Sequence, residues 1–354
     1  MKSLTSLLST ALETVGLAGE LFRSRPPGAL TTKGDRDMAT EMDFIVERAV
    51  RDFLHKQTPT IAFLGEEEGP EDNGAESLWV LDPVDGTANL VHGVPLCGIS
   101  LGLLQEGRPV LGVIDLPFLG SRYWAVEHQG AFVDGRRLQA SQTANLRDAI
   151  VAIGDYDVGP NARDNNPLQL AVTERLAAEA LRVRMLGSAA IDLAWTAEGR
   201  LDVSIALANK PWDVSAGVIL AREAGAHVVD RDGSPHTLDS AATIAVAPQL
   251  LDVVIELVRR LDTEPERSRS PLARQTAYGQ MANLLRQEIL AGEYEPRDDN
   301  PRRNELPGAA ELGAKYGVSD KTASRAVQQL IAEGLVMSRP GLRPIVVPRK
   351  ERQS

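Results

Sequence analysis

The chain has 354 residues, 43% of them hydrophobic and 25% charged, which suggests two or three globular domains and excludes a disordered or collagen-like chain. Its formal net charge of −11 disfavours nucleic-acid binding when the chain is taken as a whole. The charge is uneven, however: residues 1–262 carry 23 basic and 37 acidic residues, and residues 263–354 carry 15 and 12. A change of sign along a chain indicates parts with separate roles.

The N-terminal segment and the single cysteine limit the compartment and the cofactors. Residues 4–15 place apolar side chains at helical spacing, so we predict an amphipathic first helix and no signal peptide. Cys97 lies in an apolar run, where it is expected to be a buried apolar side chain, and a lone cysteine excludes an internal disulfide. No stretch approaches the ~18 apolar residues of a membrane span. We therefore expect a cytoplasmic protein that does not interact with membranes.

Helices and strands are mixed through the first 262 residues. Residues 41–54 are predicted to form a helix, and 61–64 and 78–81 short buried strands that end in acidic residues. Gly and Pro break residues 99–132 into strand-like runs typical of an antiparallel meander. The predicted core face of the first of these helices contains Ile45, Val46, Ala49, Val50 and Phe53. An α+β or layered α/β domain over 1–262 follows.

A linker and a second domain follow. Charged residues, Ser and Pro dominate residues 262–271, so we place a linker at 263–273 and a second domain at 274–350. Helices are predicted at 278–290, at 311–316, and from a cap at Ser319 or Asp320 to about 333. Two short apolar runs, 335–337 and 345–347, flank a turn that contains Arg339 and Arg343. Three helices and a basic hairpin are typical of a winged helix-turn-helix.

The largest concentration of candidate catalytic residues follows the strand at 78–81. Asp82 ends this strand, and Asp85 follows on a segment that Pro83 should stiffen into a turn. Two carboxylates this close repel each other unless a cation lies between them, and hard oxygen ligands suit Mg²⁺. The backbone N–H groups of Gly86 and Thr87 then open a new segment and suit a phosphate. A metal site beside a phosphate-binding segment is typical of enzymes that transfer a phosphoryl group to water.

Two further acidic residues fit the same site. Glu66 follows the preceding strand, and Asp213 begins a helix within residues 210–217. A rival chemistry uses an aspartate nucleophile, as in haloacid-dehalogenase-type phosphatases, whose two aspartates are two positions apart. Here Asp82 and Asp85 are three positions apart with a proline between them. That spacing disfavours an aspartyl-phosphate intermediate.

Three elements of this region, 65–67, 82–87 and 212–217, together resemble the signatures of the inositol monophosphatase family, in matching order over residues 1 to about 262. The resemblance implies a layered αβαβα sandwich that is usually dimeric. It also implies Mg²⁺-dependent hydrolysis of a small phosphate monoester, in which a metal-activated water attacks phosphorus in line and no phosphoenzyme forms.

The resemblance further implies residue roles. Metal ligands are implied at Glu66, Asp82, Asp85, Asp213 and the backbone carbonyl of Val84. Catalytic roles are implied for Asp43, Glu66 and Thr87, with Thr87 and Asp43 orienting the attacking water. Substrate contacts are implied at Val84, Asp85, Gly86, Thr87, Gly187, Ser188, Ala189 and Asp213, although residues 187–189 could equally form a closely packed turn between a strand and a helix.

One position departs from the family pattern. Ala206 stands where inositol-cleaving members carry a Glu that binds substrate hydroxyl groups. The alcohol half of the substrate therefore stays open among histidinol phosphate, a sugar phosphate and a nucleotide.

Residues 278–348 resemble a GntR-type DNA-binding domain. The resemblance is carried by Leu306-Pro307, Glu311-Leu312, Tyr316 to Ser319, Thr322, Arg325-Ala326, Leu330 and Glu333 to Val336. It implies dimeric binding of double-stranded DNA, with the third helix in the major groove and the wing near the minor groove. The DNA contacts implied are Ser319, Lys321, Thr322, Arg325, Arg339 and Arg343. Ala310, Asp320 and Ser324 stand where the family often has Arg, which should weaken phosphate contacts.

Three functions remain open from the sequence. The first is a Mg²⁺-dependent phosphatase of a small phosphorylated metabolite that carries a DNA-binding domain and forms a homodimer. The second is a transcriptional regulator whose phosphatase-like body senses such a metabolite without turnover. The third is a phosphatase whose winged helix serves protein contacts or dimerisation. Retention of Thr87 and Asp43 favours turnover, because a pure sensor has no need of a pair that activates water.

Overall fold

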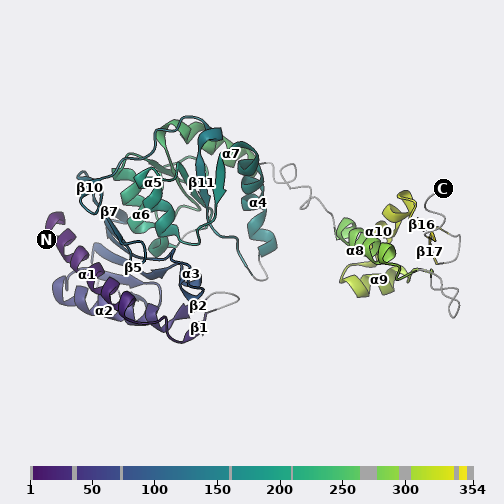
Figure 1. Cartoon of the computed structure of the whole chain (residues 1–354), viewed down its shortest axis with the longest axis horizontal. Coiled ribbons are helices and arrows are strands. Elements are labelled where there is room, and N and C mark those ends of the chain that lie inside the picture. Colours follow the sequence, from purple (N-terminus) through teal and green to yellow (C-terminus); the bar gives the residue numbers. More distant parts are fainter. Residues whose placement is uncertain are drawn as a thin grey trace. The chain divides into compact units, whose positions relative to one another are not determined.

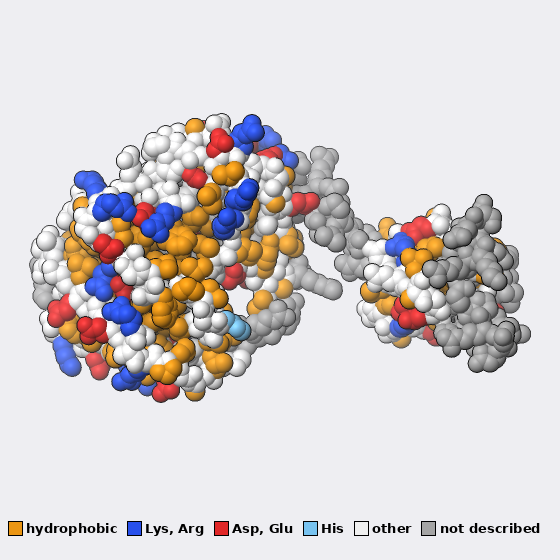
Figure 2. Space-filling view, in the orientation of Figure 1, with side chains coloured by type: hydrophobic (Ala, Val, Ile, Leu, Met, Phe, Trp, Pro, Cys, Tyr) orange, Lys and Arg blue, Asp and Glu red, His pale blue; other side chains and the backbone are white. Residues whose placement is uncertain are grey.

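The computed structural model describes residues 3–33, 38–71, 75–158, 162–208, 210–263, 277–294, 304–338 and 343–348. The chain separates into two compact units, Met1–Ser268 and Arg269–Ser354 (Figure 1). Within those ranges, no helix is both long enough and apolar enough to cross a membrane. On the visible face of the first unit, acidic and basic side chains are interspersed (Figure 2).

The first unit is built around an eight-stranded sheet in the order β10-β9-β8-β7-β6-β5-β3-β4. Strands β6 to β9 pair antiparallel with their chain neighbours, which confirms the predicted meander. Strand β3 instead runs parallel to β5, so the ends of both strands reach the same edge, where the Glu66 N–H donates to the carbonyl of Leu81 over 3.2 Å. The strands are β3 (Ala62–Gly65), β4 (Gly69–Glu71), β5 (Ser77–Asp85), β6 (Gly98–Gln105), β7 (Arg108–Leu116), β8 (Ser121–Val126), β9 (Gly130–Val133) and β10 (Arg136–Arg137).

A second, five-stranded sheet has the order β12-β11-β13-β15-β14. Because side chains alternate across a strand, Ala245 packs in a cluster with α6 while its neighbours Ile244 and Val246 pack with α7. Both faces of this sheet are therefore covered by helices. The strands are β11 (Ile150–Ile153), β12 (Arg182–Arg184), β13 (Val203–Ala206), β14 (His227–Val229) and β15 (Thr243–Val246).

The helices of the first unit form three layers. Helices α1 and α2 cover the outer face of the large sheet, α5 and α6 lie between the two sheets, and α4 and α7 cover the outer face of the small sheet. This is the predicted αβαβα sandwich. The helices are α1 (Leu4–Ser24), α2 (Glu41–Gln57), α3 (Thr87–Val91), α4 (Ala162–Glu179), α5 (Ala189–Glu198), α6 (Pro211–Glu223) and α7 (Leu251–Thr263), with one-turn helices at Leu146–Asp148 and Pro248–Leu250; a hairpin of β1 (Leu30–Thr32) and β2 (Met38–Thr40) joins α1 to α2.

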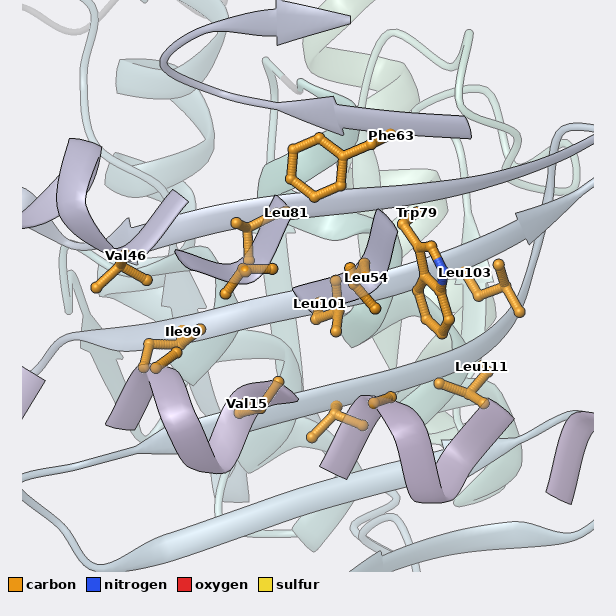
Figure 3. Close-up of a cluster of buried hydrophobic side chains, with 14 of the residues drawn as sticks. Val15, Val46, Leu54, Phe63, Trp79, Leu81, Ile99, Leu101, Leu103 and Leu111 are labelled. Atoms are coloured by element: carbon orange, nitrogen blue, oxygen red, sulfur yellow. The ribbon is translucent and has the colours of Figure 1, made fainter. Parts of the chain in front are cut away.

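The largest core lies between α1, α2 and the large sheet (Figure 3). Val15 of α1, Val46 and Leu54 of α2, and Trp79 and Leu101 of the sheet are each at most 2% exposed. Burying an aliphatic or aromatic side chain of this size contributes about 1.5–3 kcal/mol, so this layer fixes the positions of α2 and β5. Cys97 belongs to the same cluster, as expected for an inert apolar side chain, and its burial raises the pKa of the thiol to about 12.

Two local predictions were wrong, and both errors involve the site. The buried face of α2 contains Met42, Asp43, Val46, Glu47, Val50 and Leu54, whereas Ile45, Ala49 and Phe53 are only partly buried. Apolar periodicity could not find this face because it includes two carboxylates. The segment around Pro83 is also not a turn: β5 continues to Asp85, with a register shift against β6 between Asp82 and Asp85. A bulge accommodates Pro83, which has no N–H group for the ladder.

The second unit contains α8 (Ala277–Ala291), α9 (Ala309–Tyr316), α10 (Asp320–Ala332) and a small antiparallel ladder of β16 (Val336–Met337) and β17 (Ile345–Val346). Gly317 ends α9 with a left-handed φ of 66°, and the Ser319 hydroxyl accepts from the Thr322 N–H at the start of α10. The three helices and the ladder enclose one apolar cluster that includes Leu285, Leu312 and Leu330. The predicted winged helix-turn-helix is confirmed.

Candidate active site and nucleic-acid interface

One cavity of about 320 Å³ is lined by the residues that the sequence singled out in the first unit, except Asp43, which is not among its lining residues. Its walls come from the end of β5, the start of α3, the turn into α5, the end of β13 and the start of α6. Among the described residues that line it there is no Lys or Arg. Its lining includes six carboxylates: Glu66, Asp82, Asp85, Asp155, Asp192 and Asp213. Such a cavity suits ligands that bring positive charge.

The two aspartates of β5 are buried and repel their neighbours. Burial raises the pKa of Asp82 well above its ordinary value, and the charges of Glu66 and Asp85 raise it further. Burial also raises the pKa of Asp85, although this carboxylate accepts hydrogen bonds from the Ser188 hydroxyl and from the N–H groups of Ala189 (3.2 Å) and Ala190 (2.9 Å). Asp85 therefore joins β5 to the N-terminus of α5, and residues 187–189 line the cavity.

Glu66 lies beside a lysine that sequence reasoning missed. The Lys33 ammonium is 3.2 Å from the Glu66 carboxylate and 2.5 Å from that of Glu67. A second missed residue, Glu47, accepts the N–H groups of Glu67 (2.8 Å) and Glu68 (2.9 Å) and so holds this loop. An acid inside the helical stretch 41–54 gave a weak signal for Glu47, whereas nothing around Lys33 in the sequence marks it.

The part of the cavity lined by Glu66, Asp82, Asp85 and Asp213, here called the acidic wall, has the side chains of a metal site. No three Asp, Glu, His or Cys side chains of the described ranges converge closely enough to hold an ion as they stand, and Lys33 provides the compensating charge next to Glu66. The donor set nevertheless fits a hard divalent cation, because carboxylates and a carbonyl oxygen are its preferred ligands. Burial and the charges of Asp85 and Glu66 also raise the pKa of Asp213 to about 7, a repulsion that a bound cation would relieve.

Thr87 connects the cavity to α2. Its Oγ1 lies 2.9 Å from the carbonyl oxygen of Val84 and 3.2 Å from Oδ1 of Asp43. The other oxygen of Asp43 accepts from the Thr40 N–H (2.8 Å) and the Thr40 hydroxyl (2.5 Å). Burial raises the pKa of Asp43, and these hydrogen bonds oppose the shift. The threonine oxygen is thus held at the cavity wall by two fixed acceptors.

Gly86 permits a close approach that no other residue could make. It has a left-handed φ of 87°, and a Cβ there would lie 2.8 Å from the carbonyl oxygen of Leu96 and 3.1 Å from that of Gly187. The Asn89 side chain donates to the carbonyls of Leu96 (2.7 Å) and Leu186 (2.8 Å). The start of α3 and the turn before α5 are therefore joined along one edge of the cavity.

The cavity lining also contains two acids that sequence reasoning missed, Asp155 and Asp192. Asp192, in the first turn of α5, is 5% exposed, and its Oδ1 has no hydrogen-bond partner within the described part of the chain. Burial raises the pKa of Asp192 well above its ordinary value, as do the charges of Asp85 and Asp155. An acid in the apolar stretch 190–194 was the available signal, because lone buried carboxylates are rare. Ala206 lines the same cavity.

In the second unit, the predicted DNA contacts divide into three groups. Lys321 and Arg325 are exposed on α10, whose opposite face packs in the core. The Ser319 hydroxyl caps this helix by accepting from the Thr322 N–H (3.3 Å), and the two hydroxyls lie 2.9 Å apart. Arg343 pairs with Glu311 of α9 over 2.8 Å, and Arg339 lies outside the described residues. The described ranges thus present two exposed cations on the expected recognition helix.

Comparisons with known proteins agree with both units. The sequence model of the inositol monophosphatase family matches residues 3–263, and that of the gntR family of bacterial regulatory proteins matches residues 277–346. The chain is 36% identical over 260 residues to inositol-1-monophosphatase ImpA of Mycolicibacterium smegmatis, covering 73% of this chain and 94% of ImpA. It is 34% identical over 231 residues to fructose-1,6-bisphosphatase/inositol-1-monophosphatase of Thermotoga maritima (65% and 86% covered). The crystal structure of extragenic suppressor protein suhB from Bartonella henselae superposes with a TM-score of 0.68 at 27% identity, covering 72% of this chain and 99% of suhB.

Proposed function

The chain belongs to the inositol monophosphatase family and carries a DNA-binding domain of the gntR family, and on that premise we propose that it is a Mg²⁺-dependent phosphatase of a small phosphate monoester that also binds double-stranded DNA. The observation that carries the phosphatase proposal is the Thr87–Asp43 pair beside the acidic wall. It supports turnover over the alternative in which the body only senses a metabolite, because binding alone does not need a fixed hydroxyl–carboxylate pair.

In this proposal Glu66, Asp82, Asp85, Asp213 and the Val84 carbonyl hold Mg²⁺. The ions would activate a water and neutralise the phosphate and the departing alkoxide. A metal held there would compete with the Lys33 ammonium for the Glu66 carboxylate. The Asp85 carboxylate keeps its hydrogen bonds to α5, which hold residues 187–189 against the substrate.

Thr87 and Asp43 orient the attacking water. The Thr87 oxygen accepts a hydrogen bond from the water while its own proton is shared with Asp43 or the Val84 carbonyl. The water oxygen forms a bond to phosphorus, and its proton passes to the Thr87–Asp43 pair. The ester P–O bond on the opposite side breaks, and the alcohol leaves with a proton from solvent. Gly86 and Thr87 hold the phosphate oxygens through their backbone N–H groups.

Phosphate release tests this proposal. Inositol 1-phosphate, histidinol phosphate, fructose 1,6-bisphosphate and adenosine 3′,5′-bisphosphate are offered to the full chain with and without Mg²⁺, and then to Asp85→Asn. The names of the relatives motivate the first and third compounds. We expect Mg²⁺-dependent turnover of at least one ester, reduced about 10³-fold or more in Asp85→Asn. Binding of these esters without phosphate release from any of them would instead support the sensor.

The DNA-binding part of the proposal rests on the exposed cations of α10. A homodimer would present two such helices to two half-sites, and a role on DNA agrees with the cytoplasmic location expected from the sequence. Arg325→Ala should weaken binding of duplex DNA and reduce its salt dependence, because one phosphate contact is lost. Arg286→Ala removes the same charge from an ion pair with Glu333 and serves as control. Absence of binding at low salt would favour a winged helix that makes protein contacts.

A further inference from the structure

A second cavity of the first unit, of about 340 Å³, lies between α1 and the strands β7 and β8. It shares no described lining residue with the proposed active site, and its volume is in the range of small-molecule sites. Charged and apolar side chains both line it, chiefly Leu12 and Arg23 of α1, Asp115 of β7, Arg122 and Trp124 of β8, and Asp134 of the turn between β9 and β10. Neither the phosphatase nor the DNA-binding proposal uses these residues.

Two guanidinium groups of this cavity share one buried carboxylate. Asp115 is 5% exposed, and its Oδ1 accepts a hydrogen bond from Nε of Arg122 over 2.8 Å. Nη1 of Arg23 lies 3.7 Å from the other oxygen of Asp115. Helix α1 approaches this carboxylate closely through Gly19, where a Cβ would lie 2.7 Å from Oδ2 of Asp115. Two cations around one anion leave a net positive charge beside the cavity.

Both guanidinium groups keep donors for a ligand. Within the described ranges, Asp115 is the only side chain that accepts from the Arg122 side chain, through Nε, and the Arg23 side chain donates no hydrogen bond. The Arg23 side chain is 47% exposed and that of Arg122 is 31% exposed, so both are accessible. The planar fork of a guanidinium matches a carboxylate. This part of the cavity therefore suits a carboxylate group.

An exposed carboxylate lines the same cavity. Oδ1 of Asp134 accepts the backbone N–H of Arg122 over 3.0 Å, and in the described part of the chain Asp134 forms no ion pair. Its accessible negative charge would repel a ligand that is only anionic and would attract one that also carries an ammonium group. A free α-amino acid has both charges on one carbon atom, whereas in a peptide they lie at opposite ends.

The rest of the cavity wall is apolar and firmly packed. The Trp124 ring stacks on that of Phe132, with centroids 4.3 Å apart and an interplanar angle of 17°. Trp124 and Leu12 are partly buried against the core between α1 and the large sheet. A fixed indole beside an aliphatic side chain suits an apolar or aromatic group of a ligand.

We propose that this cavity binds a free α-amino acid with an apolar or aromatic side chain. Arg23 and Arg122 bind its carboxylate, Asp134 binds its ammonium group, and its side chain packs against Trp124 and Leu12. The ligand is an effector and not a substrate, because the cavity contains none of the residues of the proposed catalytic site. This inference does not rest on the phosphatase function.

Calorimetric titration of the full chain with matched ligands tests the proposal. L-Phenylalanine and L-leucine are compared with phenethylamine, which lacks the carboxylate, and with 3-phenylpropanoate, which lacks the ammonium group. We expect at least one amino acid to bind, and L-phenylalanine to bind about tenfold or more tightly than either analogue, because each analogue loses one set of charge-assisted hydrogen bonds. Absence of binding by both amino acids, or equal binding of L-phenylalanine and phenethylamine, would overturn the inference.

Two variants assign the two ends of the ligand. Asp134→Asn keeps the acceptor for the Arg122 N–H and should weaken binding of the amino acid about tenfold without weakening that of 3-phenylpropanoate. Arg23→Gln should weaken binding of the amino acid and of 3-phenylpropanoate, and leave that of phenethylamine unchanged. Asp148→Asn removes an exposed charge outside the cavity and serves as control. Unchanged binding of the amino acid in both Asp134→Asn and Arg23→Gln would place the ligand elsewhere and overturn the inference. Calorimetry needs no turnover, so the result is independent of whether any ester is hydrolysed.

Discussion

Among the described residues, buried carboxylates occur in the first unit and not in the second. In the first unit, Asp82, Asp85 and Asp192 are buried in one cavity whose described lining has no Lys or Arg. In the second unit, the ion pairs Arg286–Glu333, Lys315–Glu288 and Arg343–Glu311 lie at the surface. Exposed pairs contribute about 0–1 kcal/mol each, whereas buried like charges are costly. An uncompensated buried charge therefore points to a ligand more strongly than an exposed cation does.

Among substitutions that keep the proposed metal ligands, the largest effect should come from Thr87→Val, which keeps the size of the side chain and removes the hydroxyl. We expect kcat to fall about 10²–10³-fold, because neither Asp43 nor Val84 can position the water without this oxygen. Thr87→Ser retains the hydroxyl and should keep most of the activity. Steady-state phosphate release at saturating Mg²⁺ measures both variants. Equal rates for Thr87→Val and the unmodified protein would show that the pair is structural.

Gly65→Ala should disturb the loop that contains Glu66 through its contact with Glu47. A Cβ at this position would lie 2.2 Å from the Glu47 carboxylate, so Glu47 must release the N–H groups of Glu67 and Glu68. We expect a loss of about 1–3 kcal/mol of stability, measured by urea unfolding. Gly16→Ala in α1 of the same unit would place its Cβ no closer than 3.6 Å to a neighbouring atom and serves as control. A Gly65→Ala protein as stable as the unmodified one would mean that the loop is not held by Glu47.

The acidic and basic residues around the cavity show what the sequence could and could not predict. Asp82, Asp85, Glu66 and Asp213 were found because acids at strand ends and a helix start are visible as local patterns, and the structure places all four on one cavity. Lys33 and Asp192 were missed because their relation to the site depends on packing between distant elements. The buried face of α2 was mispredicted for the same reason, since Glu47 and Asp43 are buried to serve a loop and a hydroxyl.

The buried carboxylates should also make stability depend on pH and metal. The pKa of Asp213 is raised from 3.8 to about 7, and that of Asp82 is raised as well. An acid whose pKa is higher in the folded state stabilises the fold when protonated, so this contribution is complete below pH 3.8 and is lost as the pH rises toward about 7. Without Mg²⁺, the melting temperature should therefore decline over this range relative to that of Asp213→Asn, which lacks the titrating group.

The effect of Mg²⁺ on the melting temperature tests whether these carboxylates cause the decline with pH. The ion competes with protons for the same carboxylates, so it should raise the melting temperature more at pH 8 than at pH 5. We expect the stabilisation by Mg²⁺ to be about 1–2 kcal/mol larger at pH 8. Asp82→Asn should be the more stable protein without metal and should respond less to Mg²⁺. An equal response to Mg²⁺ at both pH values, or in both proteins, would contradict a metal site built on Asp82.

The smallest effect is expected for an exposed ion pair of the second unit. Glu311→Gln breaks the exposed pair with Arg343, which should cost at most about 0.5 kcal/mol of stability, and it removes a negative charge near the wing. Without this anion, phosphate is repelled less at Arg343, so we expect duplex DNA to bind about two- to threefold more tightly at low salt, with a steeper salt dependence. Fluorescence anisotropy at several salt concentrations measures both quantities. In an Arg343→Ala background, Glu311→Gln should keep only the gain from general charge. An equal gain in both backgrounds would mean that Arg343 does not reach DNA, and the α10 cations would then have to carry the interface.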